Sequence, residues 1–123
     1  MCARENVDGK RSEIQFKAFV VHLILNGNVE RALEQLAEHY NVTSPRIQVG
    51  LPRRHGTKAS GCYTAKNQTI HVLNSDTLKD PYVILHEFYH HLRTSIDKKH
   101  RGTEKYASQF ARDFFREGRQ MTT

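Results

Sequence analysis

Apolar residues recur at helical spacing near the start of the chain, every third or fourth position, as in an amphipathic helix. The motif Ser12-Glu13-Ile14-Gln15 fits a capping box, so we expect this helix to begin there and to end at Asn26-Gly27. A second helix is predicted over about residues 28–40. The sequence therefore predicts a helical scaffold over residues 12–40, preceded by a flexible segment of residues 1–11.

The pattern changes after Pro45, where apolar and polar residues alternate and no longer recur at helical spacing. Residues 47–51 alternate as a half-buried strand does, and a loop rich in Gly, Pro and basic residues follows them. Residues 62–64 and 69–73 are typical of two further strands joined by a polar turn. We expect a small, mostly antiparallel sheet within residues 45–74.

The last part of the chain predicts two more helices. Asp80-Pro81 combines an N-cap acceptor with a proline at the first helical position, which favours a helix over residues 80–94. After a charged loop, apolar residues at helical spacing predict another helix over residues 103–118. A chain of 123 residues has the length of one domain. The expected architecture is a single α+β domain spanning residues 1–123, with two helices, a small sheet and two further helices.

Composition narrows the class of protein. Hydrophobic residues make up 37% and charged residues 26%, which is typical of a soluble globular chain. No apolar run approaches the ~18 residues that a membrane span needs, and the first ten residues show no secretory signal. We therefore expect a cytoplasmic protein without membrane contact. Cys2 and Cys62 lack the spacing of a disulfide framework or a structural zinc site, so we interpret both as free thiols.

Basic residues outnumber acidic ones and give a formal charge of +6. This balance permits contact with nucleic acid. The Lys and Arg residues form three short clusters, none of which is a nucleic-acid module with interleaved aromatics. The favoured interpretation is a solvated basic surface.

The most specific chemistry lies in the helix expected over residues 80–94, which carries the motif His-Glu-Phe-Tyr-His. His86 and His90 are four residues apart, so both imidazoles project from one helical face and can bind one Zn²⁺. Glu87 can then act as general base, taking a proton from a zinc-activated water that attacks a peptide carbonyl. An amphipathic helix with exposed histidines is the alternative interpretation.

A catalytic zinc needs a third protein ligand and an open position. Arg93 and Ile96 stand where the glycine and third histidine of the metzincin extension would be, which excludes that extension. The downstream candidates are Asp97, His100, Glu104 and Asp113. Glu104 is favoured because it opens a helix whose alanines permit close packing against the motif, although such a carboxylate can also serve only the helix dipole. His100, in the charged loop, is the competing ligand.

Four segments, in this order, resemble the ImmA/IrrE-like metallopeptidases and related minimal gluzincins. They are Gly61-Cys62-Tyr63, Thr69-Ile70-His71-Val72, the stretch from His86 to Leu92, and the stretch from Glu104 to Ala111. The resemblance implies a zincin-like fold in which His86, His90 and Glu104 bind zinc and Glu87 is the general base. It also implies a protein or peptide substrate lying along a sheet edge formed by residues 69–73.

Three functions remain open from the sequence. The first is a zinc-dependent metallopeptidase. The second is a DNA-associated metalloprotease, because His100-Arg101-Gly102 resembles the histidine–glycine pair of SprT-like proteases. The third is a non-catalytic zinc-binding module, or a latent protein whose cleft is covered by the helices of residues 12–40. The donor that would stabilise an oxyanion is open among Tyr89, Tyr106 and His100.

Overall fold

The computed structural model describes residues 2–52, 60–97 and 99–119, with the backbone alone for residues 2–12. The elements are α1 (Cys2–Leu25), α2 (Val29–Tyr40), β1 (Arg46–Val49), β2 (Gly61–Thr64), β3 (Thr69–Val72), a 3-10 helix η1 (Ser75–Lys79), α3 (Pro81–Ile96) and α4 (Glu104–Arg119). The order confirms the α+β prediction of N-terminal helices, a three-stranded sheet and two C-terminal helices.

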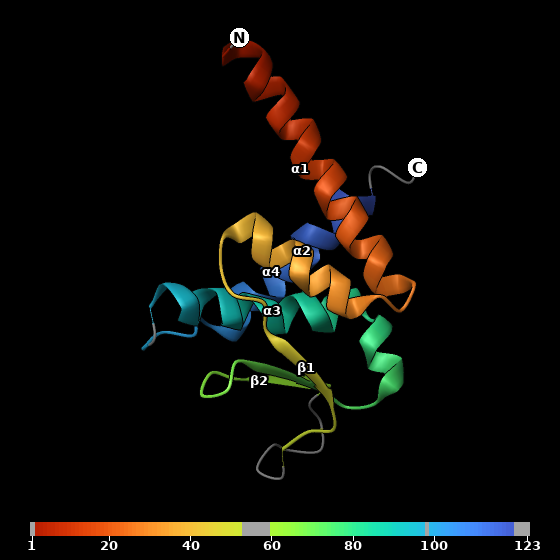
Figure 1. Ribbon diagram of the computed structural model, residues 1–123, viewed down its shortest axis with the longest axis vertical. Helices are drawn as coiled ribbons and strands as arrows, with labels where there is room; N and C mark the ends of the chain where they lie inside the picture. The colour runs from red at the N-terminus through yellow and green to blue at the C-terminus, as the bar shows by residue number, and fades with distance from the viewer. Residues whose placement is uncertain (1, 53–59, 98, 120–123) are drawn as a thin grey trace.

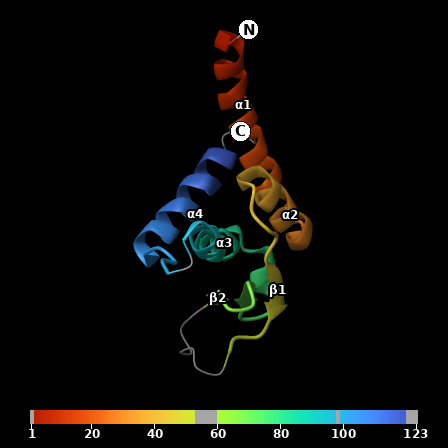
Figure 2. The same ribbon diagram turned by 60° about the vertical axis from the view of Figure 1, so that its left-hand side comes forward.

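Helix α3 lies in the middle of the molecule, with the sheet on one side and the other helices on the opposite side (Figure 1). Figure 2 looks nearly along α3 and shows α4 on one side and the α1–α2 pair on the other, converging above α3, with the strands below. The central position explains why most residues of α3 are buried. Ile84, Leu85 and Phe88 on α3, Ile70 on β3 and Phe114 on α4 are at most 1% exposed and belong to one apolar core.

Helix α1 begins at Cys2, so the prediction that it starts near Ser12 is wrong. The segment before Ser12 contains no proline and several strong helix formers, so nothing in it stops the helix. The capping-box motif therefore lies inside the helix. The other end agrees with the prediction, since Gly27 adopts a φ of +85° directly after α1. The first part of α1 projects beyond the rest of the molecule (Figures 1 and 2).

The sheet is mixed, with the strand order β1-β3-β2. Strand β2 pairs antiparallel with β3, whereas β1 pairs parallel with β3, so the expectation of a mostly antiparallel sheet is only half right. Alternation reports which face of a strand is buried and not the direction of its neighbour, which is why the sequence did not reveal this pairing. Strand β3 is central and buried along its length. The prediction that residues 69–73 form a sheet edge is therefore wrong, and β1 and β2 are the edges.

Helices α3 and α4 have the expected starts. Asp80 is the N-cap of α3, where its side chain accepts a hydrogen bond of 3.0 Å from the backbone N–H of Tyr82. Thr103 precedes α4 and accepts a 3.1 Å bond from the N–H of Tyr106 in the same way. Both caps satisfy N–H groups that a helix start leaves unpaired. The short helix η1, capped by Asn74, had not been predicted.

Of the basic clusters, residues 53–58 and Lys98 lie outside the described residues. Within the described part of the chain, no helix has both the length and the apolar character required to cross a bilayer.

Candidate metal centre

The two histidines of the α3 motif and the first residue of α4 meet at one point. His86 Nε2 lies 3.1 Å from Glu104 Oε1, and His90 Nε2 lies 2.6 Å from Glu104 Oε2. One ligand atom from each of the three residues lies within 4.8 Å of the other two. Helical spacing puts the histidines one turn apart on one face, and α4 packs against that face with its first turn opposite them. The structure thus brings together the three residues that the sequence suggested.

His90 is oriented by the backbone. Its Nδ1 atom lies 2.7 Å from the carbonyl oxygen of Arg101, which can only accept, so Nδ1 carries the hydrogen and donates. The lone pair of the neutral ring is therefore on Nε2, the atom that faces Glu104. A histidine that binds a metal is held by this kind of contact at its second nitrogen.

His86 is oriented by α4. Its Nδ1 atom lies 3.3 Å from the hydroxyl oxygen of Ser108. Ser108 follows Glu104 by four residues, so the same helical face supplies both a candidate ligand and a group that holds the imidazole. Ser108 was not predicted from the sequence, although its spacing from Glu104 was available as a signal. The carbonyl of Arg101 was not predicted either, because the sequence carries no signal for it.

The buried nitrogen of His90 provides a test of whether a metal fits. His90 Nε2 has no hydrogen-bond partner with acceptable geometry among the described residues, although a carboxylate oxygen lies 2.6 Å away. A neutral imidazole nitrogen and a carboxylate oxygen so close together both present lone pairs, and a shared cation stabilises such a pair. Two imidazole nitrogens and a carboxylate form a donor set that suits Zn²⁺. These residues therefore form a candidate metal site.

The local electrostatics favour the protonation states that metal binding requires. Burial lowers the pKa of His90, against the opposing effect of its bond to the Arg101 carbonyl, so the ring is favoured in its neutral form. Partial burial alone would raise the pKa of Glu104, but the hydrogen bond from His86 and the neighbouring imidazoles outweigh it and lower that pKa. Glu104 is therefore held as a carboxylate.

Glu87 lies beside this cluster and is 6% exposed. Burial, reinforced by the negative charge of Glu104, raises the pKa of Glu87 to about 7, while the positive charge of Arg101 opposes the shift. A carboxyl group whose pKa lies near neutrality can both accept and return a proton at that pH. A nearby divalent cation would favour the ionised form.

An open cleft of about 360 Å³ adjoins the cluster. Its lining residues are Ser60, Gly61, Asp80, Tyr82, Val83, His86, Glu87 and Glu104. Strand β2 forms one wall at Gly61, where an added Cβ would lie 2.8 Å from Val83 Cγ1 and 3.4 Å from Glu87 Cγ. Glycine is thus the residue that allows β2 to approach α3 so closely. Among the residues that the structure describes, none of α1 or α2 lines the cleft.

The other sequence candidates lie elsewhere. His100 is exposed, with Nε2 3.8 Å from Asp97 Oδ2, and Asp113 pairs with Arg116 at 2.7 Å. Cys62 is buried on β2 and does not belong to the cluster. Over the described ranges, His86, His90 and Glu104 form the only group of three or more such side chains close enough to share an ion. The ring of Tyr89 meets that of His90 edge to face and Tyr106 is exposed, so the oxyanion donor stays open.

No protein-family model matches the chain, and comparisons with curated proteins and with solved structures give no match either. The functional argument therefore rests on the geometry of the site.

Proposed function

We propose that the chain is a zinc-dependent metallopeptidase with a gluzincin-type site in a zincin-like fold. The observation that carries this proposal is the convergence of His86, His90 and Glu104 beside the buried carboxyl group of Glu87, at the wall of an open cleft. A structural zinc site is closed by four protein ligands, whereas a catalytic site has three and an open position. Three candidate ligands next to a cleft fit the catalytic arrangement.

Each residue has a distinct part in the proposed reaction. His86, His90 and Glu104 would hold a zinc ion, which when bound would supply the Lewis acidity that activates a water molecule and polarises the carbonyl of a peptide bond. Glu87 accepts the proton of the attacking water and passes it to the departing amine. Ser108 and the Arg101 carbonyl keep the two imidazoles in the orientation that zinc requires.

The free edge of β2 supports an extended peptide as the substrate. The backbone N–H of Leu73 donates to the carbonyl of Ser60 over 2.9 Å. This bond shows which opposite residues of β2 and β3 form hydrogen-bonded pairs and which do not. In an antiparallel pair the bonded positions alternate, so the backbone groups of Gly61 and Tyr63 point away from β3. Gly61 also lines the cleft. A peptide added along β2 would therefore pass the candidate zinc site.

The other two functions have less support. The SprT-like alternative needs His100 as a ligand, and that side chain is 71% exposed and lies outside the cluster. A latent site covered by the N-terminal helices would need α1 or α2 to line the cleft, and neither does within the described residues. The described residues present no feature that favours nucleic acid as a partner beyond the overall charge.

The substitution Glu87→Gln tests this proposal. It removes the proton acceptor and keeps the side-chain size, so we expect zinc to remain bound and peptide hydrolysis to fall by about 10²–10⁴-fold. The measurement is cleavage of a mixed peptide library by the zinc-loaded proteins, followed by mass spectrometry.

Glu38→Gln is the matched control, because Glu38 is exposed on α2, far along the chain from the cleft, and should leave the rate unchanged. The proposal fails if zinc-loaded Glu87→Gln hydrolyses the library at the wild-type rate. It also fails if the zinc-loaded wild type cleaves no peptide.

A further inference from the structure

The two ends of β2 differ in charge. At the Gly61 end, the carboxyl groups of Asp80, Glu87 and Glu104 line the cleft. At the other end, Lys66 follows in the turn after β2, and the positive charge of Arg101, in the loop before α4, acts on Tyr63 of β2. A peptide lying along β2 would thus pass from an acidic region that holds the candidate zinc site to a basic region.

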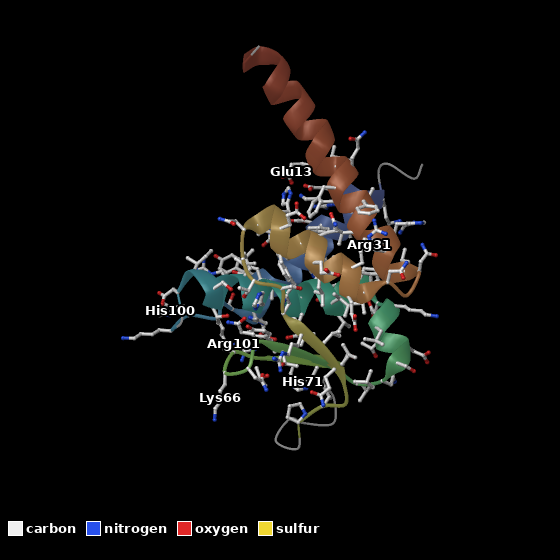
Figure 3. The ribbon with its side chains drawn as sticks, in the orientation of Figure 1. Glu13, Arg31, Lys66, His71, His100 and Arg101 are labelled. Atoms are coloured by element: carbon white, nitrogen blue, oxygen red, sulfur yellow. The ribbon has the colours of Figure 1, made fainter. Side chains whose placement is uncertain are left out.

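Arg101 is fixed in place through its backbone. Its carbonyl oxygen accepts the bond from His90 Nδ1, which holds this residue against α3. Its positive charge acts on Cys62 and Tyr63 of β2, where it lowers the pKa of both groups against the raising effect of burial, and also on Glu87 of α3. Figure 3 shows Arg101 between α3 and the sheet. Across the described residues, no carboxylate forms an ion pair with its guanidinium.

Lys66 lies where β2 ends. It lines a cavity of about 550 Å³ between the β2–β3 turn and the end of α3. The lining residues are Thr43, Tyr63, Ala65, Lys66, Gln68, Thr94 and Ser95, so Lys66 supplies the cavity's charge and the others are polar or aromatic apart from one alanine. Figure 3 shows Lys66 extending outward from the turn. In the described part of the chain its ammonium group has no ion-pair partner either.

The acidic groups near this end are few. Asp97 follows α3, and its carboxylate caps the backbone N–H of Lys99 at 3.0 Å and lies 3.8 Å from His100. It therefore has local partners of its own and does not line the cavity. Lys66 lines the cavity, and Arg101 does not line it but acts by its charge on Tyr63, which does. Two cations that have no carboxylate partner among the described residues, at this end of β2, form a binding region for a negatively charged group.

We propose that Arg101 and Lys66 form a subsite that selects substrates with an acidic side chain about three residues from the bond to be cleaved. The spacing follows from the length of β2, since an extended chain advances about 3.3 Å per residue and β2 runs over four residues from the cleft to the basic end. This inference rests on the proposed peptidase function and names the substrate class. Arg101 thus has two parts: its side chain would bind the acidic group of the substrate, and its backbone carbonyl orients His90.

Binding measurements test the subsite separately from catalysis. The probes are fluorescent, end-capped decapeptide pools of neutral random sequence, each with one glutamate at a fixed position, and matched pools with glutamine there. They are titrated by fluorescence anisotropy against the zinc-loaded Glu87→Gln protein. We expect glutamate pools to bind about tenfold more tightly than glutamine pools, with the preference weakening as salt increases.

Three variants test which residues cause the preference for glutamate over glutamine. Arg101→Gln and Lys66→Gln should each reduce it to less than about threefold, and Arg101→Gln keeps the backbone carbonyl that holds His90, so zinc content should be retained. Arg112→Gln, which removes an exposed arginine of α4, should keep the preference. Equal binding of glutamate and glutamine pools would overturn the proposal, and so would an unchanged preference in both Arg101→Gln and Lys66→Gln.

Cleavage by the wild type separates the two proposals. If the wild type cleaves the pools about tenfold faster with glutamate three residues from the cleaved bond, both proposals are supported. If it cleaves glutamate and glutamine pools equally, the subsite is wrong and the peptidase function stands. If it cleaves neither pool while the binding preference is present and lost in Arg101→Gln, the peptidase function is wrong and the anion-binding region stands.

Discussion

At the residue scale, the contact at one nitrogen of each imidazole decides what the other nitrogen can do. The carbonyl of Arg101 requires a hydrogen on His90 Nδ1, which leaves Nε2 as the lone-pair atom that faces Glu104. Ser108 orients His86 in a similar way, through a hydroxyl group that can donate or accept a hydrogen bond. The hydroxyl is the more adjustable partner, and it belongs to a side chain that can be removed without changing the backbone.

Ser108→Ala is therefore an informative substitution. Removing the hydroxyl leaves His86 freer to rotate, and loss of such an orienting contact typically weakens metal binding by 10–100-fold. Because the 3.3 Å contact is long, we expect the lower end, a loss of zinc affinity of about tenfold, measured by competition with a fluorescent chelator.

Ser95→Ala serves as the control, since the Ser95 hydroxyl donates to the backbone carbonyl of His91 over 2.8 Å and touches none of the three candidate ligands. Equal zinc affinity in wild type and Ser108→Ala would contradict an orienting role for this serine.

His91 shows why a third histidine on α3 is not a candidate ligand. It is fully buried, its Nε2 donates to the carbonyl of Thr43 over 2.6 Å, and its Nδ1 accepts from the hydroxyl of Tyr63 over 2.7 Å. Both nitrogens are thus occupied, and the residue ties α3 to β2 and to the segment before β1. Tyr63 is accordingly a structural residue, because its hydroxyl group is bound to His91.

At the element scale, the function depends on how closely β2 and α4 approach α3. An alanine at Gly61 would bring its Cβ within 2.8 Å of Val83 and 3.2 Å of the His71 carbonyl, so β2 would have to move away from the helix that bears Glu87. We expect Gly61→Ala to lower the free energy of unfolding by about 1–3 kcal/mol and to slow peptide hydrolysis more than tenfold. Urea unfolding and library cleavage measure the two effects.

Gly118→Ala is the matched control for steric damage away from the site. Its Cβ would lie 2.9 Å from the carbonyl oxygen of Lys17 where α4 crosses α1, so a comparable loss of stability is expected. The folded fraction should hydrolyse peptides at the wild-type rate, because neither glycine 118 nor α1 adjoins the cleft. Equal loss of hydrolysis in both variants would contradict a special role for the β2–α3 approach.

The four α-helices were predictable, apart from the start of α1, because local signals fix them. Asp80 and Pro81 mark the start of α3, and Gly27 marks the end of α1. The pairing of strands depends on segments distant in the sequence, so the parallel neighbour of β3 and the central place of β3 could not be deduced from alternation. The candidate ligands were predictable for the same reason as the helices, since His86 and His90 share a helical face and Glu104 opens the next helix.

At the scale of the whole molecule, the apolar core and the candidate zinc site are separate. The core joins α1, α2, the sheet and the inner sides of α3 and α4 through apolar side chains, none of which is a metal ligand. The site joins only α3 and α4, and it connects the middle of α3 to the first turn of α4. The fold should therefore form without metal, and zinc should add stability by holding α4 to α3.

This separation predicts the thermal behaviour of the protein. Metal-free protein should unfold cooperatively, and zinc at about 100 times its dissociation constant should add about 2.7 kcal/mol. For a chain of 123 residues this corresponds to a rise in Tm of about 10 °C. Calorimetry in chelator and in zinc measures the shift, and Glu104→Ala should abolish most of it. A chain that is unfolded in chelator would contradict the separation of core and site.

The central claim is that His86, His90 and Glu104 bind one zinc ion, and the stoichiometry of zinc measured against a competing chelator tests it most directly. We predict one zinc per chain for the wild type, for Glu87→Gln and for His100→Ala, and a loss of at least about 100-fold in affinity for Glu104→Ala. Full zinc binding by Glu104→Ala together with its loss in His100→Ala would contradict the account.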